Sequence, residues 1–379
     1  MKILILNWRD NANPKAGGAE VVVHELIHRW VSWGHKIVLF TSTFSGGERV
    51  VKRKNLMIFR YGNDLSVRFF FWLYHRIFKN RFDIVIEAQT AGIPWFASFF
   101  LNTPILLLFH QTGRDYPNGS LNNSVLFYEI PKPLAILAFW LEPVLLKLST
   151  RIPAIAVSFS TKQDLMKLGF YNKNVVVIRS GFSTPIILPE IRKSKVPTVI
   201  SLGRLTGQKR VEESILAFYF IKKELTEAKM MIVGRGTPQY EKHLRNLVKK
   251  LGLKSAIAFY GFLSEEEKYN LLSKAHILLT TSIREGWGLV VIEANITLTI
   301  AVGYEVPGLR DSIINGETGL LVKRRDPKEL AQAVIHIFKQ PDKLEGMAKN
   351  ARRYALSLSW DNAARSYLKV ISLLLKTDE

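Results

Sequence analysis

The sequence of 379 residues contains no cysteine. Disulfide bonds, thiolate metal ligands and a cysteine nucleophile are therefore excluded. Long low-complexity tracts are also missing, and 47% of the residues are hydrophobic, which argues against disorder in any large part of the chain. The length exceeds that of one typical compact domain and suits two domains of about 180 residues each.

Long hydrophobic runs are scarce as well. The N-terminal run, residues 3–6, is shorter than the roughly 7–15 apolar residues of a signal peptide, so we interpret it as the first strand of a cytoplasmic protein. Residues 88–113 carry no Lys, Arg, Asp or Glu, but Pro104 would break a membrane-spanning helix there. We expect a helix near residues 93–101 and a buried strand over 105–109 instead.

Acidic residues are few, since 32 Asp and Glu stand against 53 Lys and Arg and give a formal net charge of +21. Between positions 49 and 81, nine cations accompany a single acid, Asp64, with aromatic residues at 69–72 and 74. This mixture is typical of an interfacial helix and predicts peripheral contact with the anionic inner face of the cell membrane. The alternative is a surface helix whose aromatic side chains face the core. No recognition motif accompanies the charge, so we expect no nucleic-acid partner.

Strand and helix patterns alternate along both halves of the chain. Short, continuous apolar runs are typical of parallel strands covered on both faces, and apolar residues at helical spacing over 22–31, followed by Gly34, indicate a capped helix. The pattern predicts an α/β protein with two Rossmann-like, doubly wound parallel-sheet domains. The predicted strands are 3–6, 37–41, 82–87, 104–109, 152–158 and 175–178 in the first half, and 198–202, 229–233, 256–260 and 277–280 in the second.

The boundary between the halves is expected within residues 183–197, which combine three prolines with cations and no periodicity. We predict an N-terminal domain over 1–185, a C-terminal domain over 186–358, and a terminal segment, 359–379, that packs back toward the first domain. The expected helices of the second half cover 211–220 and 240–251, begin at 289, and end with an amphipathic helix over 360–375.

Ligands of open α/β sheets bind beyond the carboxyl ends of the strands, so the loops after the strands are the candidate sites. Gly17 and Gly18 precede a helix, where glycines let the backbone approach a phosphate, although the pair could be an ordinary turn. Arg204 and Lys209 flank the loop after strand 198–202. An Arg fork and a Lys charge suit a diphosphate, and the alternative is a solvated basic turn.

A third loop reads REGWGL over residues 284–289 and leads into a helix that holds Glu293. Glu285 lies in the loop and Glu293 in the second turn of the helix. One carboxylate can therefore meet a ligand at the loop while the other accepts hydrogen bonds from hydroxyls deeper in the cleft. The glycines expose N–H groups to sugar hydroxyls or phosphate oxygens. Two glutamates at this spacing are, by themselves, common by chance.

Together these segments resemble the retaining GT-B glycosyltransferases, a family that includes sucrose synthase, bacterial phosphatidylinositol mannosyltransferases and cell-surface polysaccharide enzymes. The resemblance implies two Rossmann-like domains that face a central cleft, with the acceptor bound by the first and the nucleotide-sugar donor by the second. It is carried by AGGAE (16–20), SLGRLTGQKRVEESILAF (201–218), MIVGRG (231–236), SIREGWGLVVIEA (282–294) and VPGLRDSIINGETGLLV (306–322).

The resemblance also implies a role for the matching positions. Arg204 and Lys209 would neutralise the donor diphosphate, Glu293 would hold the ribose hydroxyls, and Glu285 would lie beside the donor sugar. His110 matches a histidine near the donor sugar, although a strand-end histidine taken by itself is more often structural. The further donor-binding positions are Gly17 and Gly18 opposite the diphosphate, Gly286, Trp287, Gly288 and Leu289 through their amides, and Arg235 and Phe262 near the base.

The reaction that the family implies is transfer of a sugar from a nucleotide-diphosphate sugar with retention of the anomeric configuration. Such enzymes usually need no metal, and we expect neither a metal nor another cofactor here. The acceptor is expected to be a glycan or a polyprenyl-linked precursor of a cell-surface glycan. That acceptor would explain the basic aromatic stretch 49–81.

Two segments depart from the family pattern. Leu298 and Ile300 stand where the family has Gly and Pro, and because leucine is strained at positive φ we expect the loop 295–300 to take another path. Residues 179–183 lack the family's Asn before and Asp after the glycine. These departures leave open a non-catalytic member that binds a nucleotide sugar or a partner enzyme. A nucleotide-sugar epimerase is a further alternative.

Overall fold

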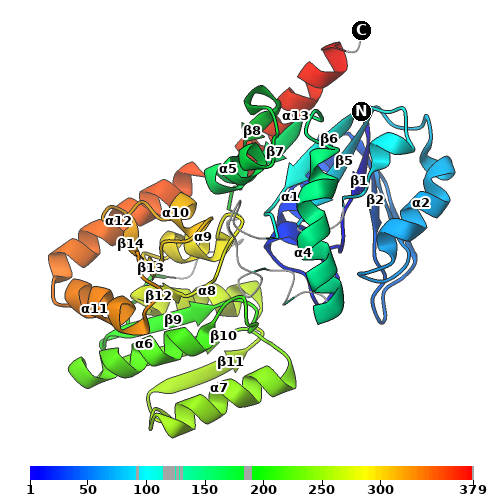
Figure 1. The fold of residues 1–379 in the computed structure, drawn as a ribbon. Helices are drawn as coiled ribbons and strands as arrows, with labels where there is room; N and C mark the ends of the chain where they lie inside the picture. Colours follow the sequence, from blue (N-terminus) through cyan, green and yellow to red (C-terminus); the bar gives the residue numbers. More distant parts are fainter. Residues whose placement is uncertain (91–93, 114–123, 125–127, 129–130, 183–189, 378–379) are drawn as a thin grey trace. The chain divides into compact units, whose positions relative to one another are not determined.

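The computed structural model describes residues 1–90, 94–113, 124, 128, 131–182 and 190–377 (Figure 1). Contacts between residues divide the chain into two compact units. Unit 1 comprises Met1–Gly181 with Ser359–Glu379, and unit 2 comprises Phe182–Leu358. The predicted domain boundary at 185/186 lies outside the described residues and stays a prediction.

The sheet of unit 1 has eight strands within the described residues, in the order β3-β4-β2-β1-β5-β6-β7-β8. Neighbouring strands are parallel, except that β3 and β4 form an antiparallel pair at one edge. β5 and β6 are buried along their whole length, as their continuous apolar sequences predict. The strands are β1 (Lys2–Leu6), β2 (Lys36–Thr41), β3 (Val50–Arg53), β4 (Leu56–Arg60), β5 (Ile84–Gln89), β6 (Ile105–Phe109), β7 (Ala154–Ala156) and β8 (Val175–Val177).

The helices of unit 1 include the C-terminal one, which packs on the first. The indole Nε1 of Trp30 donates to the carbonyl of Ala364 at 3.2 Å, and Arg29 pairs with Asp361 at 2.5 Å. The first helix ends before Gly34, which has a φ of +87° and completes the predicted cap. The helices are α1 (Gly18–Ser32), α2 (Val67–Phe78), η1 (Ala97–Phe99), α4 (Lys132–Lys147), α5 (Phe159–Lys167), η3 (Asn172–Asn174) and α13 (Trp360–Thr377).

The basic aromatic stretch 49–81 is not one helix, so that expectation is wrong. Its first part forms the β3–β4 hairpin, because apolar residues suited to strands flank the turn at 54–55, and only the second part forms α2. On α2 the aromatic side chains divide. Phe71 is fully buried and packs on Phe40 with ring centroids 5.8 Å apart, whereas Phe69 faces solvent.

The helix expected near residues 93–101 is also wrong, since only the single turn η1 forms there within the described residues. Phe96 has a φ of +56°, a left-handed conformation that no α-helix continues through. The buried carboxylate of Glu87, on β5, accepts from the N–H of Ala97 at 2.7 Å and holds this turn against the sheet. The strand expected at 105–109 is β6 and is confirmed.

Unit 2 contains, in the part that the structure describes, a sheet of six parallel strands in the order β11-β10-β9-β12-β13-β14. Helices lie on both sides of it (Figure 1). Three predicted strands agree residue for residue with β9, β10 and β12, whereas β13 and β14 were not predicted. The strands are β9 (Thr198–Leu202), β10 (Lys229–Val233), β11 (Ile257–Gly261), β12 (Ile277–Thr280), β13 (Ile300–Tyr304) and β14 (Gly319–Val322).

The helices of unit 2 connect these strands. Hydrogen bonds of Lys193 hold the end of the expected linker, residues 190–197, against this unit. The Nζ of Lys193 donates to the carbonyl of Thr297 and to the hydroxyl of Thr299, each at 2.8 Å, and to the carbonyl of Ala275. Residues 190–197 therefore belong to unit 2 rather than to a free linker. The helices are α6 (Val211–Glu224), α7 (Pro238–Lys250), α8 (Glu265–Lys274), α9 (Leu289–Ile296), α10 (Leu309–Ser312), α11 (Pro327–Phe338) and α12 (Pro341–Ser357).

The altered loop after α9 does not avoid the left-handed region, so that expectation is wrong too. Leu298 has a φ of +59°. The N–H of Leu298 donates to Asn295 O at 3.1 Å and the N–H of Thr299 donates to Ala294 O at 3.1 Å, which is the Schellman pattern of a helix end. These bonds, with those of Lys193, hold a leucine where glycine is the usual residue, and the backbone remains strained there.

We predict that Leu298→Gly stabilises unit 2 by about 1 kcal/mol, because glycine removes the cost of a left-handed leucine. Differential scanning calorimetry of the full chain measures the effect on the transition temperature. Leu298→Ala is the matched control, since it shortens the side chain but keeps the Cβ that causes the strain. A Leu298→Gly protein no more stable than Leu298→Ala would contradict the prediction.

Candidate functional site

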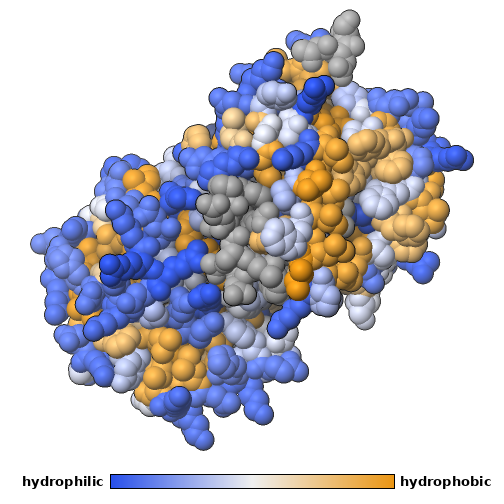
Figure 2. Space-filling model, viewed as in Figure 1, coloured by the Kyte–Doolittle hydropathy of each residue, from blue (hydrophilic) through white to orange (hydrophobic). Residues whose placement is uncertain are grey.

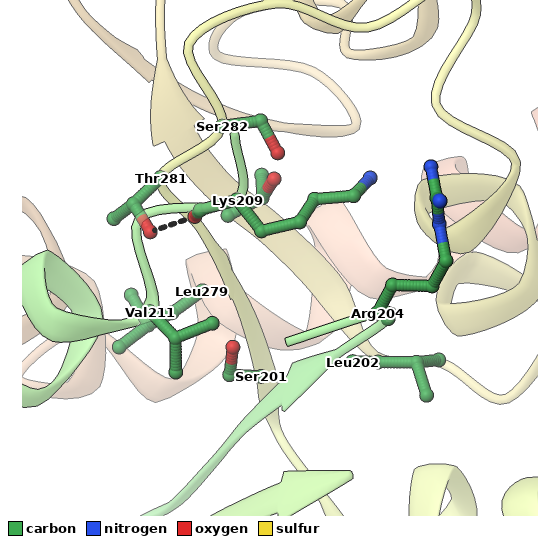
Figure 3. Close-up of a pocket in the computed structure, with 10 residues that line it drawn as sticks. Ser201, Leu202, Arg204, Lys209, Val211, Leu279, Thr281 and Ser282 are labelled. Carbon is green, nitrogen blue, oxygen red and sulfur yellow. Dashed lines mark hydrogen bonds between the residues drawn. The ribbon is translucent and has the colours of Figure 1, made fainter. Parts of the chain in front are cut away.

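A small open hollow lies at the carboxyl ends of β9 and β12 in unit 2 (Figure 3). This is where an open α/β sheet binds its ligands. Both predicted cations of the loop after β9, Arg204 and Lys209, line the hollow. The other lining residues are Ser201, Leu202, Gly203, Val211, Leu279, Thr280, Thr281 and Ser282.

The floor of the hollow depends on two strand-end glycines. Gly203, after β9, and Gly234, after β10, have φ values of +135° and +134°. A Cβ on Gly234 would lie 1.8 Å from the carbonyl oxygen of Gly203, so only glycine lets the two backbones approach this closely. The loop after β9 can therefore turn across the end of β10.

Hydrogen bonds join the loop after β9 to the loop after β12. The hydroxyl of Thr281 donates to the carbonyls of Lys209 and Arg210 at 2.9 and 2.8 Å. Gln208 is buried, and its side-chain Nε2 donates to the backbone carbonyl of Arg284 at 3.1 Å. The backbone carbonyl of Gln208 accepts from the N–H of Ile283 at 2.9 Å. The two loops thus form one rigid wall that carries both the cations and Glu285.

Lys209 and Glu285 form an ion pair at 2.5 Å, and both side chains are largely buried. The same carboxylate oxygen accepts from the Ser282 hydroxyl at 2.6 Å. The guanidinium of Arg204 and the ammonium of Lys209 extend toward the same side of the hollow (Figure 3). In this arrangement Glu285 balances the charge of Lys209, and an anion that enters the hollow competes for it.

The position of Glu285 is set by a further glycine. The N–H of Glu285 donates to the carbonyl of Pro307 at 3.0 Å, and Gly308 has a φ of +81°. A Cβ on Gly308 would lie 2.2 Å from the carbonyl oxygen of Glu285. Downstream, Gly288 caps the start of α9 with a φ of +89°, and the Trp287 side chain is buried, so only the backbone of Trp287 can face a ligand.

Glu293, on α9, is held by a cation that the sequence interpretation missed. Lys268 of α8 donates to a carboxylate oxygen of Glu293 at 3.0 Å and to Glu265 at 2.7 Å. Burial lowers the pKa of Lys268, but the two carboxylates more than offset it and leave the pKa raised. Lys268 follows Glu265 by one helical turn, yet nothing in its sequence spacing points to Glu293. Ser282 and Gln208 were missed for the same reason, because their partners lie on other loops.

Arg235 and Phe262, the expected base neighbours, follow β10 and β11, which are adjacent strands. Both side chains are exposed, Phe262 at 73%. A Cβ on Gly261 would lie 4.0 Å from Nε of Arg235, which places the cation beside the turn that carries the aromatic ring. An exposed ring next to a guanidinium offers a face on which a base can stack.

The glycines of the first loop lie at the start of α1 in unit 1. The N–H of Gly17 donates to the carboxylate of Glu20 at 2.7 Å, so the protein itself already satisfies this amide. A phosphate at this helix start would have to displace Glu20 or use other amides. The assignment of Gly17 and Gly18 to the donor stays a prediction.

His110 is buried at the end of β6. Its backbone N–H donates to the carbonyl of Gln89 at 2.8 Å, and among the described residues its Nε2 has no hydrogen-bond partner. Burial lowers the pKa of His110 to about 3, so the imidazole is neutral at physiological pH. A neutral ring can donate or accept a hydrogen bond but cannot supply a positive charge to a phosphate.

The chain matches two family descriptions that together cover most of its length. Residues 16–184 match Glycosyltransferase Family 4, and residues 186–354 match Glycosyl transferases group 1. Each of the two segments therefore matches a glycosyltransferase family. The predicted resemblance is thereby confirmed, and Arg204, Lys209, Glu285 and Glu293 all lie within the group 1 segment.

Solved structures confirm the predicted GT-B fold. Sucrose-phosphate synthase from Thermosynechococcus elongatus superposes with a TM-score of 0.80 at 20% identity and covers 99% of both chains. Anabaena HepE in complex with UDP and glucose gives a TM-score of 0.71 at 18% identity, over 98% of this chain and 99% of that one.

Among curated relatives, the D-inositol 3-phosphate glycosyltransferase of Corynebacterium urealyticum is 31% identical over 129 residues, which are 34% of this chain and 30% of the relative. The chain spans less than half the length of the curated relatives it matches.

We predict that His110 makes unit 1 sensitive to acid. Because the folded pKa lies below the unfolded value of 6.5, the unfolded state binds the proton first, and stability falls as pH drops below 6.5 toward 3. His110→Gln removes this contribution. When the pH falls from 7 to 5, the free energy of unfolding of the native protein should therefore drop by about 2 kcal/mol more than that of the variant.

Urea denaturation followed by tryptophan fluorescence tests this prediction. Trp287 is the one tryptophan of the sequence that falls in unit 2, so the fluorescence signal reports mainly on the unfolding of unit 1. Lys349→Gln, a change at an exposed residue of α12, controls for general effects of substitution. Equal losses of stability in the native and His110→Gln proteins over this pH range would show that His110 does not resist protonation.

Proposed function

We propose that the chain transfers a sugar from a nucleotide-diphosphate sugar to an acceptor hydroxyl, with retention of configuration and without a metal or other cofactor. One observation carries the proposal: Arg204 and Lys209 line the same hollow at the end of β9, and Glu285 is paired with Lys209 at its rim. Two cations suit the two phosphates of a nucleotide diphosphate, which is the leaving group of this reaction.

Binding of the donor would exchange the partner of Lys209. The diphosphate oxygens take the ammonium from Glu285, and the released carboxylate can then accept hydrogen bonds from hydroxyls of the donor sugar. The amides from Gly286 to Leu289, at the start of α9, lie next in the chain and are proposed to contact the same sugar.

In the proposed step, the bond from the anomeric carbon to the diphosphate oxygen breaks, and its electron pair stays on that oxygen beside Arg204 and Lys209. The acceptor oxygen forms the new bond on the same face of the sugar, and its proton passes to the departing oxygen. His110, neutral through burial, would act through a hydrogen bond to the donor sugar rather than as a charge. Gly17 and Gly18 are proposed to approach the diphosphate.

Glu293 and the exposed pair Arg235 and Phe262 are proposed to hold the nucleoside. The ion pair with Lys268 orients Glu293, so its carboxylate can accept from two ribose hydroxyls. Phe262 can stack on the base, with Arg235 at its edge. UDP or UDP-glucose is the ligand in the solved Anabaena HepE complexes, and a uridine donor is therefore the first to test here.

We further propose a glycan or polyprenyl-linked acceptor, which would bring the protein to the cytoplasmic face of the membrane through residues 49–81. Support comes from α2, where Phe69, Leu73 and Ile77 expose apolar side chains at helical spacing, and from the exposed Leu65 just before the helix. Within the described residues, no helix has the length and apolar character needed to cross a bilayer. Nucleic acid is not part of the proposal.

A non-catalytic nucleotide-sugar-binding protein remains the alternative. Its main argument was a displaced loop at 295–300, and that argument weakens because Leu298 takes the left-handed conformation expected of the family glycine. Measurement of turnover, rather than of binding alone, decides between the two functions.

We predict that Lys209→Ala and Glu285→Gln separate binding from turnover. Lys209→Ala should weaken nucleotide-diphosphate binding by about 10- to 100-fold, because a charge-assisted contact is lost. Glu285→Gln should bind the nucleotide diphosphate at least as tightly, since Lys209 loses its internal partner, while release of nucleotide from the sugar donor falls by about a hundredfold or more.

Calorimetric titration with uridine, guanosine, adenosine and thymidine diphosphates and their sugars measures binding, and assay of the freed diphosphate measures turnover. Lys349→Ala is the matched control, because Lys349 forms an exposed ion pair with Glu345 on α12. Binding of a donor with no turnover in the native protein would favour the non-catalytic alternative, and no binding by folded protein would reject both.

A further inference from the structure

Helix α4 presents an apolar face to solvent. Trp140, Val144 and Leu148, which follows the helix, are 65%, 59% and 61% exposed. Figure 2 shows hydrophobic residues gathered over α4 and over the part of unit 1 that holds α2. This face lies outside the stretch 49–81 and was not recognised in the sequence. The exposed apolar residues are Leu134, Ile136, Leu137, Trp140, Leu141, Val144 and Leu148.

The face is wider than a helix-pairing seam. At 100° per residue these side chains span about 160° around the helix, whereas a coiled-coil seam occupies a narrower stripe. The opposite face packs into unit 1 through Ala135, Phe139 and Leu146. A face this broad suits a continuous apolar medium better than a single partner helix.

The charges of α4 are arranged around this face. Lys132 and Lys147 stand at its two ends and are exposed. Glu142, the one acid in the α4 sequence, is buried, and its carboxylate accepts from the N–H of Gly113 at 2.9 and 3.2 Å. The exposed surface of the helix is therefore apolar along its length and cationic at both ends.

We propose that the exposed face of α4 binds an anionic lipid bilayer, with the helix lying in the plane of the interface. Its 16 residues make a helix about 24 Å long, so insertion parallel to the surface buries the whole apolar face. Trp140 then sits at the headgroup level, which indole side chains favour, and Lys132 and Lys147 meet lipid phosphates.

A second copy of the chain is a less suitable occupant. Two copies packed through α4 would bring the same terminal lysines together on proteins that each carry a net charge of +21. Such a contact repels, whereas an anionic membrane attracts both the lysines and the net charge.

Flotation of the full chain with vesicles tests the proposal. The native protein should bind vesicles of phosphatidylcholine mixed with phosphatidylglycerol, and bind phosphatidylcholine alone much more weakly. The triple variant Leu137→Gln, Trp140→Gln, Val144→Gln should reduce the partition coefficient for the mixed vesicles by at least about tenfold. The three residues are exposed, so the variant should fold, and unchanged nucleotide-diphosphate binding verifies that it does.

The matched control replaces three exposed apolar residues elsewhere, Tyr171, Leu356 and Leu373, with glutamine and should keep native vesicle binding. The proposal is overturned if the native protein does not bind the mixed vesicles, if the α4 variant binds as well as the control, or if only substitutions at Phe69, Leu73 and Ile77 of α2 abolish binding. It is also overturned if the native protein is a dimer that the α4 variant dissociates. Vesicle binding needs no sugar transfer, so this proposal and the proposed function fail separately.

Discussion

The ion pair between Lys209 and Glu285 joins two loops that stand 76 residues apart in the sequence. Each loop begins at the carboxyl end of a central strand, β9 or β12, and the hydrogen bonds of Thr281 and Gln208 hold them together. The rest of the candidate site follows from this link, because it sets where cations and carboxylate stand before any ligand enters. A ligand with two phosphates meets charges that are already in place, which reduces the reorganisation required on binding.

Hydrogen bonds also fix the backbone conformation at the end of α9. At Leu298, which departs from the family pattern, two backbone hydrogen bonds and the partly buried ammonium of Lys193 close the helix end around a left-handed leucine. The cost is local strain of about 1–2 kcal/mol rather than a displaced loop. A departure in sequence is thus a weak argument for loss of activity when neighbouring bonds impose the conformation.

Much of the fold could be predicted because parallel strands buried on both faces have continuous apolar sequences, and β9, β10 and β12 agree with their predictions residue for residue. Prediction failed where local pattern and tertiary context disagree. The segment 49–81 was interpreted as one helix by composition, although a hairpin precedes α2. Of the site, the cations and glutamates were predicted from motifs, whereas Lys268 and Gln208 were missed because their partners are distant in the sequence. The broad face of α4 was missed because its apolar residues resemble those of a buried helix until exposure is known.

The glycines at 203, 234 and 308 divide the site into parts that can and cannot be redesigned. A side chain at 234 or 308 would clash with a backbone carbonyl, so these positions of the hollow tolerate no residue larger than glycine. Arg235 and Phe262 stand outside this framework and are exposed. If these two residues hold the base, as proposed, then over evolutionary time, or in a directed-evolution library, a change of donor base should appear first at these positions while the glycines are kept.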